Sequence, residues 1–338
     1  MKYEDNSIIF KYIDSRSNDM FSKMSGDDLQ NIIILLNDFY LKLRNTIGLA
    51  DSITFGVELE FENANKQKIK DLLYQNFPNH SWIIKSDLSL NNGAEINSPV
   101  LKDNEISWTE LKKVCSIVFK YSKIGNNAGG HIHIGTQALG SDRQSWLNFI
   151  MLWSVYENII YRFGYGEFLT HRPSLDKYAC PVKNQLWNNY NIFIKDNVSL
   201  SDMLYKLSFN RRQGVNFTNV LKRNLDNYEE TNTIEFRCPN ATFNSEVWQN
   251  NINFFARLLN YSRSNSFDED IVQRRQCINP QWISGLNWYN DIYLDQALEL
   301  CDMIFDNNLD KIYFLKQYLK SFEVGDKSNI KTYSLVKK

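Results

Sequence analysis

The sequence has little net charge and no long uninterrupted hydrophobic run. Its 338 residues include 38 basic and 39 acidic side chains, so the formal net charge is −1. Binding to nucleic acid or to an anionic membrane favours an excess of positive charge. The most apolar stretch, 146–163, is interrupted by polar residues such as Glu157, whereas a membrane span needs about 20 mainly apolar residues. We therefore expect no nucleic-acid partner and no membrane segment.

Cysteines are few and widely spaced, at positions 115, 180, 238, 277 and 301. They form neither the close pairs of a zinc site nor the dense, even-numbered set of a secreted disulfide scaffold. The N-terminal residues also lack the basic and apolar regions of a secretory signal. These features predict reduced thiols in a cytoplasmic protein.

The rest of the composition is that of a globular protein, with 43% hydrophobic and 14% aromatic residues. Most of the expected strands alternate apolar and polar residues, unlike the continuous apolar runs of parallel sheets. This pattern predicts an α+β fold in which helices pack on one side of a curved antiparallel sheet. Periodicity predicts helices near 65–77, 105–123, 143–163 and 246–261, and strands near 53–62, 82–87, 94–98, 130–135 and 232–238.

The patterns divide the chain into three regions. Residues 1–50 are interpreted as a helical extension, 51–262 as the catalytic core and 263–338 as a mainly helical region packed on the core. Two loops within this plan, 164–200 and 262–292, are candidates for substrate selection.

The first predicted strand carries three carboxylates on one face. Because side chains alternate along a strand, Glu58, Glu60 and Glu62 point to the same side. A solvated amphipathic strand is the simpler interpretation of this segment alone. Aligned carboxylates repel each other, however, and Mg²⁺ or Mn²⁺ would relieve that repulsion.

An Asn-Asn-Gly turn signal ends at Gly93 and predicts a hairpin. With a three-residue loop and a left-handed Gly93, Ser89 lies opposite Glu95. Asp87 then lies opposite Asn97, so two more carboxylates face one side. A polar hairpin tip is the alternative interpretation.

Two further segments carry chemistry-bearing side chains. His131 and His133 share one face of a glycine-flanked strand, which favours ligand or phosphate contacts over two structural histidines. Zinc is disfavoured because no third nitrogen or sulfur ligand stands out. Glu235 and Arg237 also share a face, either as a cross-strand ion pair or as part of a site. Arginines such as Arg237 and the preceding Arg211 suit phosphoryl oxygens.

In combination these segments resemble the amidoligase family, which belongs to the carboxylate–amine ligase superfamily with glutamine synthetase and glutamate–cysteine ligase. The motifs, in order, are Gly-Val-Glu-Leu-Glu at 56–60, Asp-x-Ser at 87–89, Gly-x-Glu-x-x-Ser-Pro at 93–99, Gly-His-x-His at 130–133, Glu-x-Arg at 235–237 and Asn-x-Thr at 240–242. The resemblance implies a glutamine-synthetase-like catalytic domain, with its sheet curved around ATP and two or three divalent ions.

The resemblance also implies roles for individual residues. One Mg²⁺ would be held by Glu60, Asp87 and Glu95, and another by Glu58, His131 and Glu235, with Mn²⁺ also tolerated. Four residues would serve the phosphates: His133 beside the nucleotide phosphates or the second metal, Arg237 at the transferring γ-phosphoryl, and Arg211 with Asn216 at phosphate or substrate. Two positions depart from the pattern: Asp87 is a glutamate in glutamine synthetase, and Arg212 stands where an aromatic residue is common.

The implied activity is that of an ATP-dependent ligase that forms an amide or isopeptide bond through an acyl phosphate. Its substrates would be a glutamyl-type or peptide carboxylate and an amine, amino acid or peptide, and its oligomeric state stays open. A non-catalytic regulator that binds ATP or metal on the same fold is the alternative. A third interpretation uses Cys180 as the nucleophile of a hydrolase or transferase, but no local signature supports it and inert buried cysteines are commoner.

Overall fold

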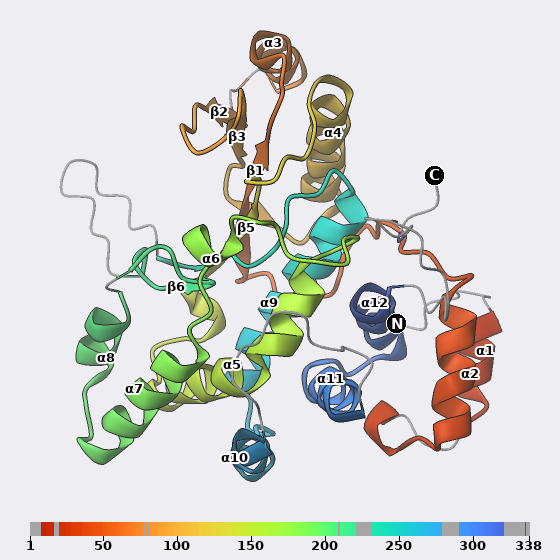
Figure 1. The fold of residues 1–338 in the computed structure, drawn as a ribbon, viewed down its shortest axis with the longest axis vertical. Helices are drawn as coiled ribbons and strands as arrows, with labels where there is room; N and C mark the ends of the chain where they lie inside the picture. Colours follow the sequence, from red (N-terminus) through yellow and green to blue (C-terminus); the bar gives the residue numbers. More distant parts are fainter. Residues whose placement is uncertain are drawn as a thin grey trace.

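The computed structural model describes residues 8–16, 20–77, 79, 81–208, 210–220, 232–278, 291–320 and 335. These residues form an α+β fold in which helices pack against a single sheet (Figure 1). The strands are β1 (Thr54–Phe61), β2 (Ile83–Lys85), β3 (Ala94–Asn97), β4 (Leu101–Lys102), β5 (Gly130–Gly135), β6 (Val215–Asn216) and β7 (Thr233–Phe236). The α-helices are α1 (Ile8–Asp14), α2 (Gly26–Leu36), α3 (Lys66–Asn76), α4 (Glu105–Tyr121), α5 (Arg143–Gly164), α6 (Leu175–Tyr178), α7 (Lys183–Lys195), α8 (Leu200–Leu207), α9 (Ser245–Arg263), α10 (Glu269–Ile278), α11 (Asp291–Ile304) and α12 (Asn308–Leu319), with 3₁₀ turns η1 (Phe21–Lys23) and η2 (Thr136–Ala138).

The sheet is open and antiparallel. Its strand order is β2-β3-β1-β5-β7-β6, and β4 pairs with one end of β1. Strands β1 and β5, which are adjacent in the middle of the sheet, come from distant parts of the sequence. The predicted α+β class with a curved antiparallel sheet is confirmed.

Aromatic side chains attach three helices to one face of the sheet. Phe55 of β1 stacks on Trp108 of α4, with ring centroids 5.0 Å apart. Phe236 of β7 stacks on Phe255 of α9 at 4.2 Å and on Trp153 of α5 at 5.8 Å. These rings are fully buried, and burying an aromatic side chain is among the largest apolar contributions to stability. The packed helices leave the opposite face of the sheet to the polar side chains.

The predicted helices and strands of the core are confirmed within a few residues, but two segments differ from prediction. Residues 164–200, interpreted as a loop, contain α6, α7 and the beginning of α8, and α10 lies within 262–292. Helix α7 lacks a local side-chain cap at Val182. The Glu157 carboxylate of α5 instead accepts from Val182 N at 2.8 Å and Lys183 N at 3.0 Å. A cap supplied from a distant helix leaves no local sequence signal.

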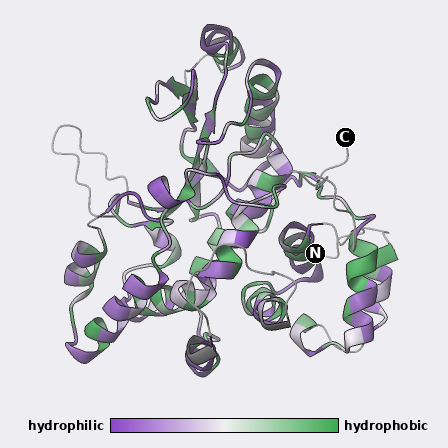
Figure 2. Ribbon diagram, in the orientation of Figure 1, coloured by the Kyte–Doolittle hydropathy of each residue, from purple (hydrophilic) through white to green (hydrophobic). Residues whose placement is uncertain are grey.

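The N-terminal and C-terminal regions contact each other. Arg44 forms an ion pair with Asp310 of α12 at 2.7 Å, and Asp302 of α11 accepts from the backbone N–H groups of Phe21 and Ser22. Figure 2 shows that α2 carries hydrophilic residues as well as hydrophobic ones, and its Ile32 is buried in the same core as the sheet. The three-region division of the chain stays a prediction. Among the described residues, no helix is long and apolar enough to cross a membrane.

A candidate metal and phosphate site

Strand register brings the predicted acidic and histidine residues onto one face of the sheet. Glu58 of β1 lies opposite His131 of β5, and Glu60 lies opposite Glu95 of β3. His133 lies opposite Glu235 of β7. Paired residues in a sheet place their side chains on the same side. Residues from four strands therefore meet on the face that the helices leave uncovered.

The hairpin before β3 differs from its prediction. Glu95 is opposite Lys85 rather than Ser89, so the loop is longer than three residues. Asn92, not Gly93, has the positive φ of 47°. A Cβ at Gly93 would lie 2.1 Å from the carbonyl oxygen of Phe61, so glycine is required there by close backbone approach.

A first candidate ligand group consists of Glu58, His131 and Glu235. One ligand atom from each lies within 4.8 Å of the others. Nδ1 of His131 is 2.9 Å from Glu58 Oε2 and 3.7 Å from Glu235 Oε1. The buried Asn216 of β6 donates to Oε2 of Glu235 and so fixes the orientation of this carboxylate. Two carboxylates and one imidazole from three strands thus converge on one point.

The second group consists of Glu60, Glu95 and His131, also within 4.8 Å of one another. Nε2 of His131 is 3.5 Å from Glu60 Oε1, and Glu60 Oε2 accepts from Gly129 N at 2.5 Å. Asp87 also lines the cleft, but its Oδ1 accepts from Ser89 N at 2.7 Å. The geometry therefore brings Glu60 and Glu95 into one group and leaves Asp87 beside it.

One imidazole connects the two groups. A neutral imidazole has one nitrogen with a free lone pair and one that carries a proton. His131 is 2% exposed. Its lone-pair nitrogen can therefore bind a metal in only one group, while the N–H of its other nitrogen faces a carboxylate of the other group. If Nδ1 is the ligand beside Glu58, the Nε2–H points toward Glu60.

His133 contacts the candidate ligand Glu58, and its place beside the nucleotide phosphates or the second metal stays a prediction. Its Nε2 is 3.2 Å from Glu58 Oε1 and its Nδ1 is 3.3 Å from Thr233 Oγ1. Burial lowers the pKa of His133, but the hydrogen bond to Glu58 and the charges of Glu235 and Glu58 outweigh it, so the pKa is raised. The side chain contacts a candidate ligand and does not line the cleft.

The carboxylates of this face perturb one another. Burial raises the pKa of Glu95 to about 7, and the negative charges of Glu58 and Glu60 act in the same direction. Burial acts to raise the pKa of Glu58 too, but its hydrogen bonds with His131 and His133 hold that pKa well below the usual range. Glu58 is therefore paired within the protein, whereas Glu95 carries the unrelieved repulsion of the group.

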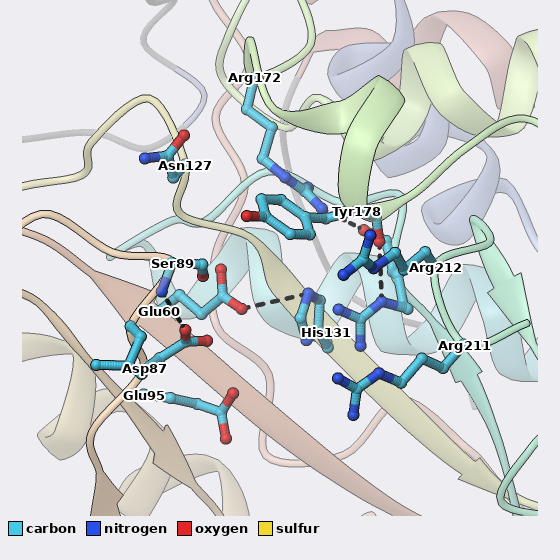
Figure 3. A pocket seen from close by; sticks show the side chains of 12 residues that line it. Glu60, Asp87, Ser89, Glu95, Asn127, His131, Arg172, Tyr178, Arg211 and Arg212 are labelled. Carbon is cyan, nitrogen blue, oxygen red and sulfur yellow. Dashed lines mark hydrogen bonds and ion pairs between the residues drawn. The ribbon is translucent and has the colours of Figure 1, made fainter.

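Acidic and basic side chains line opposite walls of a cleft of about 480 Å³. Figure 3 shows the acidic residues Glu60, Asp87 and Glu95 on one side of His131, Arg211 and Arg212 on the other, and Arg172 above it. The basic wall consists of Arg172, Arg211, Arg212 and Arg237, with Tyr178 among them. Such a cleft can bind cations at one wall and anionic oxygens at the other.

The basic wall is held by backbone and aromatic contacts. Arg237 pairs with Glu235, and its Nε donates to the Tyr178 carbonyl at 3.1 Å. Arg211 and Arg212 are exposed in the turn before β6. The Arg212 guanidinium lies 5.9 Å from the centre of the Tyr178 ring. The backbone carbonyl of Arg212 accepts from Cys180 N at 2.8 Å.

Several cleft residues were not predicted as site residues. Ser89, Asn127, Arg172 and Tyr178 line the cleft. Ser89 belongs to the Asp-x-Ser motif without an assigned role, whereas no motif marks the other three. Asn216 donates to Glu235 and accepts from Thr218 N at 2.9 Å, and its contact with phosphate or substrate stays a prediction. Its contacts are those of a residue that orients a ligand.

Cys180 has the surroundings of an inert thiol. Its Sγ donates to the Asp176 carbonyl at 2.8 Å, and burial raises its pKa. A nucleophilic cysteine needs a lowered pKa. The geometry therefore does not favour the hydrolase interpretation.

The cleft belongs to the part of the chain that a known family covers. The family model described as "Putative amidoligase enzyme" matches residues 78–259, more than half of the chain. The chain belongs to this amidoligase family. No curated protein matches it.

The amidoligase match begins after β1, so it does not include Glu58 and Glu60. Strand register nevertheless places Glu58 opposite His131, within the matched part. Glu60 is likewise placed opposite Glu95. The site of this amidoligase family member therefore combines residues inside and outside the matched region.

Proposed function

We propose that this amidoligase family member is an ATP-dependent carboxylate–amine ligase that forms an amide or isopeptide bond through an acyl-phosphate intermediate. The observation that carries the proposal is the arrangement of the cleft, in which the group of Glu60, Glu95 and His131 lines the cleft together with a wall of arginines. The group of Glu58, His131 and Glu235 adjoins it through the shared imidazole. Phosphoryl transfer depends mainly on alignment and on neutralising charge at the phosphate oxygens. Arginines and metal-bound carboxylates in one cleft would both align the phosphates and neutralise their charge.

The carboxylates on the open face of the sheet fit divalent ions of the Mg²⁺ type. Four carboxylates, on Glu58, Glu60, Glu95 and Glu235, with a single imidazole, form an oxygen-rich donor set, which suits Mg²⁺ and tolerates Mn²⁺. Burial raises the pKa of Glu95 most, and the charges of Glu58 and Glu60 add to the rise, as expected of clustered carboxylates without a cation. We assign Glu58, His131 and Glu235 to one ion, and Glu60 and Glu95, with Asp87 adjacent, to another. Bound ions would neutralise negative charge on the phosphates of ATP.

The basic wall would act on the group that is transferred. A carboxylate does not condense with an amine in water, because its oxygen is a poor leaving group. Moving the γ-phosphoryl of ATP onto that oxygen creates a good leaving group, and the amine then displaces phosphate. Arg237 would contact the γ-phosphoryl, since its fork can donate to two oxygens. Arg211, exposed at the rim, would contact phosphate or substrate.

ATP and two divalent ions are the cofactors of this proposal. The substrates would be a glutamyl-type or peptide carboxylate and an amine, amino acid or peptide. The arginine wall supports an anionic carboxylate donor.

Two measurements test the proposal against the alternative of a non-catalytic regulator. Isothermal titration with ATP and Mg²⁺ reports nucleotide binding, and ADP release is then followed with and without mixtures of carboxylates and amines. A ligase releases ADP and phosphate only when both substrates are present. A regulator binds nucleotide without release in any mixture, and absence of Mg²⁺-dependent binding would exclude both functions.

A further inference from the structure

Arg172 is a buried arginine beside the cleft, on the segment between α5 and α6. It is 4% exposed. Its Nη1 donates to the Pro239 carbonyl at 2.5 Å and its Nη2 to the Arg237 carbonyl at 2.9 Å. The two acceptors are two residues apart, so one planar guanidinium spans the turn that follows β7.

These hydrogen bonds fix the backbone of Arg237 from one side. From the other side, Arg237 N donates to the Gly214 carbonyl at 2.8 Å. The side chain of Arg237 is in turn directed by the Tyr178 carbonyl and by Glu235. Arg172 therefore supplies the hydrogen bond that holds the carbonyl side of this residue.

The same guanidinium lies against the backbone that holds Glu60. A Cβ at Gly129 would be 3.0 Å from Cζ and Nη2 of Arg172 and 3.0 Å from Nε2 of His131. Gly129 N donates to Glu60 Oε2. Arg172 thus contacts two backbone segments. One is Gly129, just before β5, which positions Glu60 of the acidic wall, and the other is the turn after β7, which positions Arg237 of the basic wall.

The Nε of Arg172 is buried and has no hydrogen-bond partner among the described residues. Leaving a buried donor unpaired costs free energy. The guanidinium is therefore oriented by the Pro239 and Arg237 carbonyls rather than by a complete set of acceptors.

We propose that Arg172 is a positioning residue that fixes Arg237 relative to Glu60 for phosphoryl transfer. This inference rests on the proposed function. A lysine at position 172 keeps the positive charge but has one ammonium in place of a planar fork, so it cannot reproduce the two-carbonyl geometry. Small misplacements of reacting groups are costly, with 1 Å costing about 100-fold in rate.

The test is a double-mutant cycle that measures ADP release and ATP affinity for wild type, Arg172→Lys, Arg237→Lys and the double variant. We expect Arg172→Lys to lower kcat about 10- to 100-fold and to change the dissociation constant of Mg²⁺–ATP by no more than about threefold. Because Arg172 acts through Arg237, the second substitution should cost clearly less in the Arg172→Lys background than in wild type. Should Arg172→Lys not fold, Arg172→Gln replaces it, since it buries no charge.

Arg162 provides a matched control. It is as buried as Arg172, and it donates to two carbonyls, those of Tyr318 at 3.1 Å and Leu169 at 2.7 Å, away from the cleft. Arg162→Lys should lower the thermal midpoint and leave kcat unchanged. Equal kcat losses in Arg162→Lys and Arg172→Lys would reduce Arg172 to a structural role.

The outcomes separate the two proposals. Independent, multiplicative losses for the Arg172 and Arg237 substitutions in an active enzyme would overturn the inference and leave the proposed function intact. Wild-type protein that releases no ADP in any substrate mixture would overturn the proposed function, and the inference with it. Coupled losses together with an active Arg162→Lys control support both.

Discussion

Glu60 of β1 and Glu95 of β3 are direct cross-strand partners on the open face of the sheet. Like charges directly opposite each other destabilise a sheet. Burial raises the pKa of Glu95 to about 7, and the charges of Glu58 and Glu60 contribute to that rise. An arrangement that is unfavourable for folding is most simply explained by a ligand that requires it.

Replacing Glu95 with glutamine should separate folding from metal binding. Glu95→Gln removes the repulsion, so the metal-free protein should be as stable as wild type or more stable by up to about 1 kcal/mol. Wild type should gain about 2.7 kcal/mol at a Mg²⁺ concentration 100 times the dissociation constant, and the variant should lose most of that gain. Urea unfolding with and without Mg²⁺ measures both effects. Glu105→Gln, on the exposed first turn of α4, is the control, and an undiminished Mg²⁺ effect in Glu95→Gln would remove Glu95 from the site.

The division of His131 between two groups predicts a stoichiometry. This imidazole offers one lone pair and can serve only one ion, so each ion depends on the carboxylates of its own group. Because the two groups have separate carboxylates, we expect two Mn²⁺ ions per chain. Glu235→Gln should remove one ion and Glu60→Gln the other, and the double variant should bind neither. Electron paramagnetic resonance of free Mn²⁺ during titration counts the bound ions. A single ion in wild type would contradict the two-site assignment.

The faces of the strands could be predicted from sequence because alternation is a local property. Because side chains alternate along a strand, Glu58 and Glu60 of β1 share one face of the sheet with His131 and His133 of β5. The order of the motifs along the chain was also enough to identify the family, as the match confirms. The α+β class followed from the same alternation.

Register and connecting segments could not be predicted in this way. In the loop before β3, Gly93 packs against the carbonyl of Phe61, a tertiary contact that no local pattern encodes. Arg172 reaches the cleft from a segment between two helices, held by Asn240 Oδ1 at its backbone N–H. Such positions depend on tertiary packing. Of the four arginines of the basic wall, the sequence therefore predicts only Arg211 and Arg237 as site residues.

Arg237→Lys tests whether this side chain serves phosphoryl transfer or only its ion pair with Glu235. A single ammonium cannot donate bidentately, so we expect kcat for ADP release to fall about 100-fold or more. The affinity for Mg²⁺–ATP should change by only a few-fold, because other contacts hold the nucleotide. Steady-state kinetics together with isothermal titration distinguish these two quantities. Unchanged kcat would show that Arg237 is only a structural partner of Glu235.

Glu157, far from any candidate ligand in sequence, predicts a pH dependence of stability. Its buried carboxylate accepts the first N–H groups of α7 and the indole N–H of Trp153, yet burial raises its pKa from the ordinary 4.5 to about 7. The folded state therefore binds this proton more tightly than the unfolded state does. Its contribution to stability is largest below about pH 4.5, falls as the pH rises, and levels off above about pH 7.

Glu157→Gln should remove this dependence. Between pH 4.5 and 7, the free energy of unfolding of wild type should fall by up to about 3 kcal/mol relative to the variant. The comparison uses the difference between the two proteins at each pH, because other groups titrate equally in both. Urea unfolding across this range measures the difference, and Glu105→Gln should follow wild type throughout. A constant difference between wild type and Glu157→Gln would mean that Glu157 stays ionised, held by the N-terminus of α7 strongly enough to cancel the cost of burial.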